Sequence, residues 1–132
     1  MITLDTSGLF TLLNRRDPDH ERAKQTLLDA GAPYLVPSGI LAEIASLLEQ
    51  RMPPALDAFL SDLETGAFIL DCGREDLPRI RQLTGRDADL ALGFADAAAI
   101  ACAERSGGLV LSFDERDFGV VAREGTIKLL PG

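Results

Sequence analysis

The stretch Ile2-Thr3-Leu4-Asp5-Thr6-Ser7-Gly8 changes from an apolar run to a polar turn, and this change decides the predicted fold. The run Ile2 to Leu4 predicts a short strand, and the apolar residues between Leu9 and Leu13 predict the helix that follows. Further strands are predicted from short apolar runs at residues 34–36, 68–70, 109–111 and 127–130.

Helical patterns separate these strands. Helices are predicted after Asp17, from Ser38 to Gln50, from Ala55 to Thr65, over residues 77–83 and from Phe94 to Ser106, with a polar loop over residues 85–89. Short strands that alternate with helices indicate a parallel sheet covered on both faces. We therefore predict an α/β protein, a three-layer α/β/α domain with a five-stranded parallel sheet.

The composition bounds the class of protein. The chain has 132 residues, the length of one domain, so a single domain over residues 1–132 is expected. Its formal net charge of −8 argues against a basic protein that coats nucleic acid or an anionic membrane. No apolar run approaches the roughly 20 residues of a membrane-spanning helix, so we expect a cytoplasmic protein without membrane association.

The chain has few residues that could bind zinc. His20 is the single histidine, and Cys72 and Cys102 are the two cysteines, which argues against a tetrahedral zinc site. Two cysteines are too few for a disulfide framework, and we expect both to be small buried residues in a reducing compartment.

Two aspartates lie close to the ends of predicted strands. Asp5 directly follows the first strand, and Asp114 follows the fourth within Ser112-Phe113-Asp114. Ligands of open α/β sheets bind beyond the carboxyl ends of the strands, where the winding direction reverses. Asp5 could instead cap the next helix, and Asp114 and Asp117 could be turn residues. If the first and fourth strands are neighbours, the two strand-end carboxylates lie close together.

Two further acidic residues lie on predicted helices. Glu43 follows Ile40 by three residues and precedes Leu47 by four, which places its carboxylate beside or within the apolar stripe of the helix. Glu43 could instead lie at the edge of this stripe, with its carboxylate in solvent. Asp96 lies in the first turn of an alanine-rich helix, where the helix dipole alone would favour it. Converging carboxylates form a hard-oxygen site suited to Mg²⁺ or Mn²⁺ and to hydrolysis at phosphoryl groups.

These residues, taken in order, resemble the motifs of the PIN-domain nucleases, and specifically of the VapC-like toxins. The similar segments are Leu4-Asp5-Thr6-Ser7, Leu41-Ala42-Glu43-Ile44, Ala95-Asp96-Ala97 and Ser112-Phe113-Asp114, with Asp117 at a frequent fifth acidic position. The resemblance covers essentially the whole chain. It implies that Asp5, Glu43, Asp96 and Asp114 are catalytic residues and metal ligands, and that Asp117 is a further ligand.

The same resemblance implies a function. It implies an endoribonuclease that depends on Mg²⁺ or Mn²⁺, cleaves tRNA, rRNA or mRNA, and acts as the toxin of a toxin–antitoxin pair. It also implies a homodimer and a cognate antitoxin that inserts a segment across the acidic site.

Two other functions remain open from the residues. A phospho-receiver signalling domain would use Asp71 as the acceptor, together with Asp5, Ser112 and Lys128, but it leaves Glu43 and Asp96 unexplained. A phosphatase with Asp5 as covalent nucleophile would want a second aspartate where the chain has Ser7.

Overall fold

The computed structural model describes residues 1–71, 73–86 and 92–132. Within these residues, five parallel strands form one sheet in the order β3-β2-β1-β4-β5. The strands are β1 (Ile2–Leu4), β2 (Tyr34–Pro37), β3 (Ile69–Asp71), β4 (Leu109–Leu111) and β5 (Lys128–Leu130). The helices are α1 (Thr6–Leu13), α2 (His20–Ala30), α3 (Leu41–Arg51), α4 (Pro53–Thr65), α5 (Leu77–Thr84), α6 (Phe94–Arg105) and α7 (Glu115–Glu124), with short 3-10 turns η1 (Ser38–Ile40) and η2 (Arg74–Asp76).

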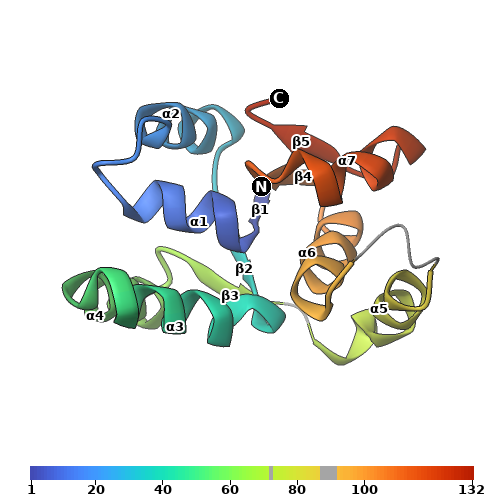
Figure 1. Cartoon of the computed structure of the whole chain (residues 1–132), viewed down its shortest axis with the longest axis horizontal. Helices are drawn as coiled ribbons and strands as arrows, with labels where there is room; N and C mark the ends of the chain where they lie inside the picture. The colour runs from blue at the N-terminus through green and yellow to red at the C-terminus, as the bar shows by residue number, and fades with distance from the viewer. Residues whose placement is uncertain (72, 87–91) are drawn as a thin grey trace.

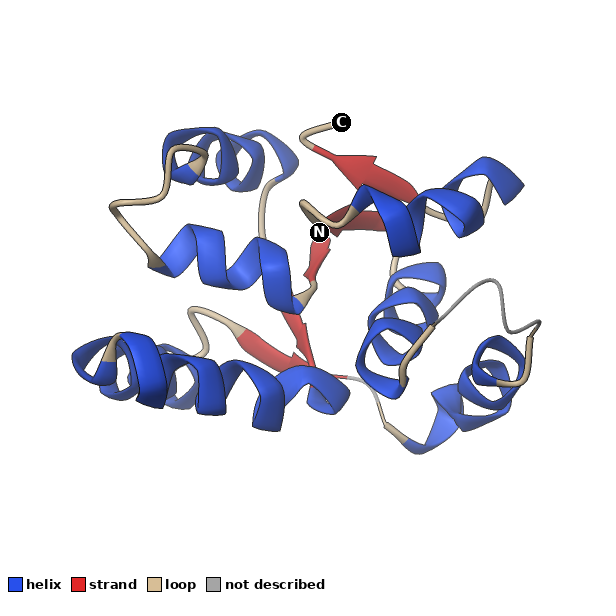
Figure 2. Ribbon diagram, in the orientation of Figure 1, coloured by secondary structure: helices blue, strands red, loops and turns tan. Residues whose placement is uncertain are grey.

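The sheet lies between two groups of helices. In Figure 1, α1 to α4 lie to the left of the strands and α5 to α7 to the right, and Figure 2 shows the strands as the layer between them. This arrangement confirms the predicted α/β/α fold with a five-stranded parallel sheet. The chain winds outward from β1 in both directions, so the winding reverses between β1 and β4, which are paired neighbours.

The alanine-rich helix α6 lies at the centre of the core. Every residue from Ala97 to Ala103 is buried, and α6 contacts β1, β2 and β4. Small side chains let the helix axis approach the strands closely, which is why this segment needs alanine rather than larger apolar residues. Its first turn therefore starts close to the carboxyl ends of β1 and β4.

The predicted elements differ from the structure in a few places. The sequence interpretation did not name α7, which connects β4 to β5, because Gly119 interrupts its helical pattern. Helix α2 begins at His20 rather than at Asp17, and α4 begins at Pro53, whose ring suits the first helical position. The predicted loop over residues 85–89 lies partly outside the described residues.

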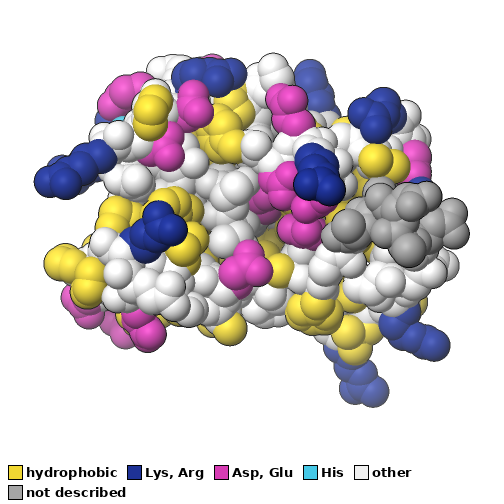
Figure 3. Space-filling model, viewed as in Figure 1, with side chains coloured by type: hydrophobic (Ala, Val, Ile, Leu, Met, Phe, Trp, Pro, Cys, Tyr) yellow, Lys and Arg dark blue, Asp and Glu magenta, His cyan; other side chains and the backbone are white. Residues whose placement is uncertain are grey.

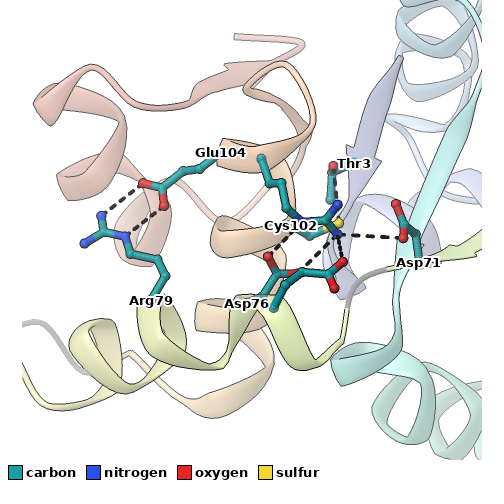
Figure 4. A network of polar contacts seen from close by, with 8 residues as sticks. Thr3, Asp71, Asp76, Arg79, Cys102 and Glu104 are labelled. Carbon is teal, nitrogen blue, oxygen red and sulfur yellow. Dashed lines mark hydrogen bonds and ion pairs between the residues drawn. The ribbon is translucent and has the colours of Figure 1, made fainter.

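An ion-pair network joins α6 to the segment after β3. Arg105 Nε donates to Asp76 Oδ1 at 2.9 Å, and its guanidinium lies 3.7 Å from Asp71 Oδ1. Arg79 on α5 makes two hydrogen bonds, at 2.8 and 3.0 Å, to Glu104, which directly precedes Arg105 on α6. Figure 4 shows this network between α5 and α6, with Asp71 approaching from β3. These pairs hold α5 against α6 on the side of the sheet that carries α6.

Cys102 is fully buried on α6, as expected, with Thr3 Oγ1 3.9 Å from its sulfur. It is disulfide-bonded, however, so the expectation of a reduced thiol is wrong. Cys72 lies outside the described residues.

None of the helices in the described ranges combines the length and the apolar character that crossing a membrane requires.

Candidate active site

Asp5 is fixed at the carboxyl end of β1 by three donors. It is 3% exposed and serves as the N-cap of α1, with Gly8 N donating to Oδ1 at 2.6 Å. Ser7 Oγ donates to Oδ1 at 3.0 Å, and Ser112 Oγ donates to Oδ2 at 2.7 Å. The structure confirms the interpretation of Asp5 as a helix cap, and the same carboxylate lines the acidic pocket described below.

The two serines also tie Asp5 to the segment after β4. Ser112 Oγ accepts a hydrogen bond from Asp114 N at 3.0 Å, and Ser7 Oγ accepts one from Phe113 N at 3.0 Å. Each hydroxyl thus links the Asp5 carboxylate to backbone that carries the next acidic residue. The sequence interpretation assigned no role to Ser7 in this site. The signal that could have found it is its place two residues after Asp5, in the first turn of the helix that Asp5 caps.

Asp114 and Asp117 come together in the first turn of α7. Asp114 is the N-cap and accepts from Asp117 N at 3.3 Å. Asp96, in the first turn of α6, faces them, and carboxylate oxygens of the three residues lie within 4.8 Å of one another. Two helix N-termini therefore meet here, and their dipoles favour the negative charge.

Glu43 approaches the same place from α3. The helix buries Ile44 and Leu48, whereas Glu43 is exposed, so its carboxylate lies at the edge of the apolar side and not within it. Glu43, Leu47 and Arg51 follow one another at four-residue spacing along the face of α3 that borders the acidic site.

The structure gathers four of the five predicted site residues in one pocket of about 400 Å³, namely Asp5, Glu43, Asp96 and Asp114, and Asp117 adjoins Asp96 and Asp114. The pocket lies beyond the carboxyl ends of β1 and β4, where the winding of the sheet reverses. Figure 3 shows acidic side chains near the centre of this face of the molecule.

Burial and mutual repulsion shift the titration of these acids. Burial raises the pKa of Asp5 to about 6, although its hydrogen bonds from Gly8, Ser112 and Ser7 oppose the shift. Burial raises the pKa of Asp96 to about 7, and the carboxylates of Asp117, Asp114, Asp5 and Glu43 raise it further. Burial and the neighbouring Asp114 also raise the pKa of Asp117.

These shifts predict a pH-dependent stability in the absence of metal. A folded-state pKa raised above the ordinary 3.8 means that the folded protein holds protons which the unfolded chain has already released. The contribution of Asp5 and Asp96 to the free energy of unfolding is therefore fully present below about pH 4, and it is lost as the pH rises to about 7. We expect the metal-free melting temperature to fall over this window less steeply in Asp96→Asn than in wild type. Parallel melting curves across the window would contradict this prediction.

The donor set fits a hard divalent cation. Clustered carboxylate oxygens are the ligands that Mg²⁺ and Mn²⁺ prefer, and a bound cation relieves the repulsion that raises the pKa of Asp96. The chain therefore has two features of one class of α/β proteins, those whose carboxylates can hold a metal ion. These features are an open parallel sheet and an acidic pocket at the point where the winding of the sheet reverses.

The phospho-receiver interpretation needs Asp71 and Lys128 beside Asp5, but neither residue lines the acidic pocket. Asp71 ends the edge strand β3 and faces Arg105, and Lys128 is an exposed residue of the opposite edge strand β5. His20 Nδ1 lies 3.3 Å from the carbonyl oxygen of Thr11, outside the acidic pocket. Among the described residues, the acidic pocket therefore includes neither the receiver's acceptor Asp71 nor the single histidine, His20.

Comparison with known proteins identifies the family. The family model described as PIN domain matches residues 2–124, and the chain belongs to this family. It is similar to Ribonuclease VapC26 of Mycobacterium tuberculosis, with 26% identity over 121 residues that cover 89% of this chain and 90% of the relative. It is also similar to the crystal structure of Mycobacterium tuberculosis VapC20, described as a sarcin-ricin loop cleaving toxin. That match has a TM-score of 0.73 and 25% identity and covers 92% of this chain and 95% of the other.

Proposed function

We propose that this PIN-domain protein is a metal-dependent endoribonuclease and the toxin of a toxin–antitoxin pair. The observation that carries the proposal is the convergence of carboxylates from β1, α3, α6 and the start of α7 in one pocket of a PIN fold. The similarity to VapC26 and VapC20, both described by their names as RNA-cleaving, supports RNA as the substrate class.

The chain's own residues would divide the work as follows. Asp96, Asp114 and Asp117 would hold Mg²⁺ or Mn²⁺, since their oxygens lie closest together. A bound divalent cation supplies Lewis-acid chemistry, lowering the pKa of an attacking water and neutralising the leaving oxyanion. Asp5, oriented by Ser7 and Ser112, would complete the ligand set.

Glu43 would act at the open side of the pocket. Its exposed carboxylate, on the opposite wall from the start of α7, could orient a water or a ligand of the cation. The nuclease unit would comprise the whole of residues 1–132 and act as a homodimer. A cognate antitoxin would neutralise it by covering the acidic pocket.

The proposal is tested with purified protein and total bacterial RNA. We expect cleavage with Mn²⁺ or Mg²⁺, none with EDTA, and recovery when the metal is restored. Expression without a partner should arrest growth, and Asp5→Asn should relieve the arrest while the protein stays folded. Metal-independent cleavage, or arrest that persists in Asp5→Asn, would argue against this site as the cause.

A further inference from the structure

A groove lined by arginines continues the acidic pocket toward the ends of α1 and α3. It has a volume of about 460 Å³ and is lined by Phe10, Leu13, Asn14, Arg15, Arg16, Arg51 and Met52. Phe10 and Arg51 also line the acidic pocket, so the two hollows share a wall. In Figure 3, basic side chains lie over the left part of the face and also along its upper, right and lower right parts, around the central acidic side chains.

The three arginines of this groove pair with no carboxylate of the described residues. Within residues 1–71, 73–86 and 92–132, no ion pair joins Arg15, Arg16 or Arg51 to an acidic side chain, and all three are exposed. Arg79 and Arg105, by contrast, are engaged with carboxylates. In a chain of net charge −8, three arginines that gather in one groove without a carboxylate are placed to bind an external anion.

Local structure holds the arginines at the mouth of the groove. Arg51 is the last residue of α3, and Arg15 and Arg16 directly follow α1, which packs against α3. Asn14 Oδ1 accepts from Arg16 N at 3.2 Å, which fixes the turn that carries the pair.

The distance along α3 from the acidic pocket to the groove suits a short stretch of a nucleic-acid strand. Glu43 and Arg51 are separated by about 12 Å along α3, from the ~1.5 Å rise per helical residue. That distance spans about three nucleotides at the ~3.4 Å rise of a stacked strand. Arginine binds phosphate through two parallel hydrogen bonds, which makes it the side chain suited to such a path.

A purely structural role explains only part of the arrangement. Arg51 interacts favourably with the negative end of the α3 dipole, which would account for a basic residue there. Arg15 and Arg16 lie beyond the end of α1, and no contact with a carboxylate in the described part of the chain explains them.

We propose that the phosphate backbone of a single RNA strand leaves the acidic pocket along this groove and is bound there by Arg15, Arg16 and Arg51. The inference rests on the proposed ribonuclease function and adds to it the direction in which the substrate runs. The groove supplies affinity through charge, whereas the acidic pocket supplies the metal site.

The test compares two triple variants of equal charge. One carries Arg15→Gln, Arg16→Gln and Arg51→Gln, and the matched control carries Arg74→Gln, Arg81→Gln and Arg123→Gln, which replace exposed arginines outside both hollows. Binding of a fluorescent random-sequence single-stranded RNA is measured by anisotropy over a range of KCl, in an Asp96→Asn background that prevents cleavage. Cleavage of total RNA and the Mn²⁺-induced rise in melting temperature are measured in the wild-type background.

We expect the groove variant to bind RNA about tenfold more weakly. We also expect the slope of log Kd against log salt to fall by about 2, because three phosphate contacts are lost and each contributes ~0.7 for a single strand. KM for RNA should rise, and the Mn²⁺-induced stabilisation should stay unchanged. The control should bind as its parent does.

Two results would overturn the inference while leaving the ribonuclease proposal intact. In the first, the groove variant keeps metal-dependent cleavage, and its RNA affinity and salt slope are unchanged. In the second, the control variant loses as much RNA affinity as the groove variant does. If the groove variant kept its RNA affinity but lost the ability to bind poly-glutamate, the groove would be assigned to an acidic protein segment instead. If wild type with Mn²⁺ neither binds nor cleaves RNA, the proposed function itself is wrong, and the groove inference falls with it.

Discussion

Asp96→Asn should abolish metal-dependent RNA cleavage and leave the fold intact. Asp96 lies close to Asp114 and Asp117 and lines the same pocket as Asp5, and burial together with these charges raises its pKa to about 7. A neutral amide removes both the ligand charge and the repulsion. Because loss of residues that merely support a metal ligand costs roughly 10- to 100-fold, we expect the loss of this ligand to reduce cleavage by more than about 100-fold.

Thermal unfolding separates this loss from misfolding. The metal-free melting temperature of Asp96→Asn should equal or exceed that of wild type, because one repelling charge is gone. Wild type should gain about 2.7 kcal/mol of stability at a hundredfold excess of Mn²⁺ over its Kd, and the variant should gain almost none.

Asp71→Asn is the matched control for this experiment. Asp71 ends a neighbouring strand but faces Arg105 outside the acidic pocket, so its Mn²⁺ response and cleavage should match wild type. If Asp71→Asn lost the Mn²⁺ response and Asp96→Asn kept it, the assignment of the metal site would be wrong. That outcome would restore the phospho-receiver interpretation.

Gly8→Ala should destabilise the protein strongly and disorganise the acidic pocket. A Cβ at Gly8 would overlap the carbonyl oxygen of Leu111 and lie 2.7 Å from its carbonyl carbon. The obstacle is the backbone of β4, which cannot rotate away as a side chain can. Helix α1 would have to move off the sheet, at a cost of about 3 kcal/mol and about 10 °C in melting temperature.

The same shift would weaken the hydrogen bonds that orient Asp5. Gly8 N donates to Asp5, and Ser7 Oγ connects Asp5 to Phe113, so both contacts depend on the seating of α1. We therefore expect a weaker Mn²⁺-induced stabilisation in the folded Gly8→Ala protein.

Gly119→Ala provides the control for the glycine substitution. Gly119 lies within α7, and its added Cβ would meet only the flexible end of Arg123, at 3.4 Å. Alanine is the better helix former, so this variant should gain up to about 1 kcal/mol. Equal melting temperatures for Gly8→Ala and Gly119→Ala would show that the close approach of α1 to β4 does not limit stability.

The sequence predicted the fold through local patterns. Short apolar runs such as Ile2 to Leu4, alternating with helical periodicity, indicate parallel strands, and the five strands of the sheet are parallel. Local pattern was weakest where a glycine interrupted it, and α7 was missed for that reason.

The sequence also singled out the acidic residues but could not decide how each was held. The sequence left Asp5 open between helix cap and site residue, and the structure shows that its carboxylate caps α1 and also lines the acidic pocket. Helical spacing placed Glu43 near an apolar stripe, yet its exposure depended on which side of α3 the neighbouring elements cover. Periodicity specifies a helix face, whereas burial depends on what packs against that face.

By itself, then, the sequence determined the alternation of strands and helices and the identity of the acidic side chains, because both depend on residues close together in the chain. Only the tertiary structure decided that β1 and β4 are neighbours, that Ser7 and Ser112 join Asp5 to the start of α7, and that Arg51 borders both hollows. These relations join residues up to 107 positions apart, as between Asp5 and Ser112. Packing of the whole chain sets such contacts, and no local pattern encodes them.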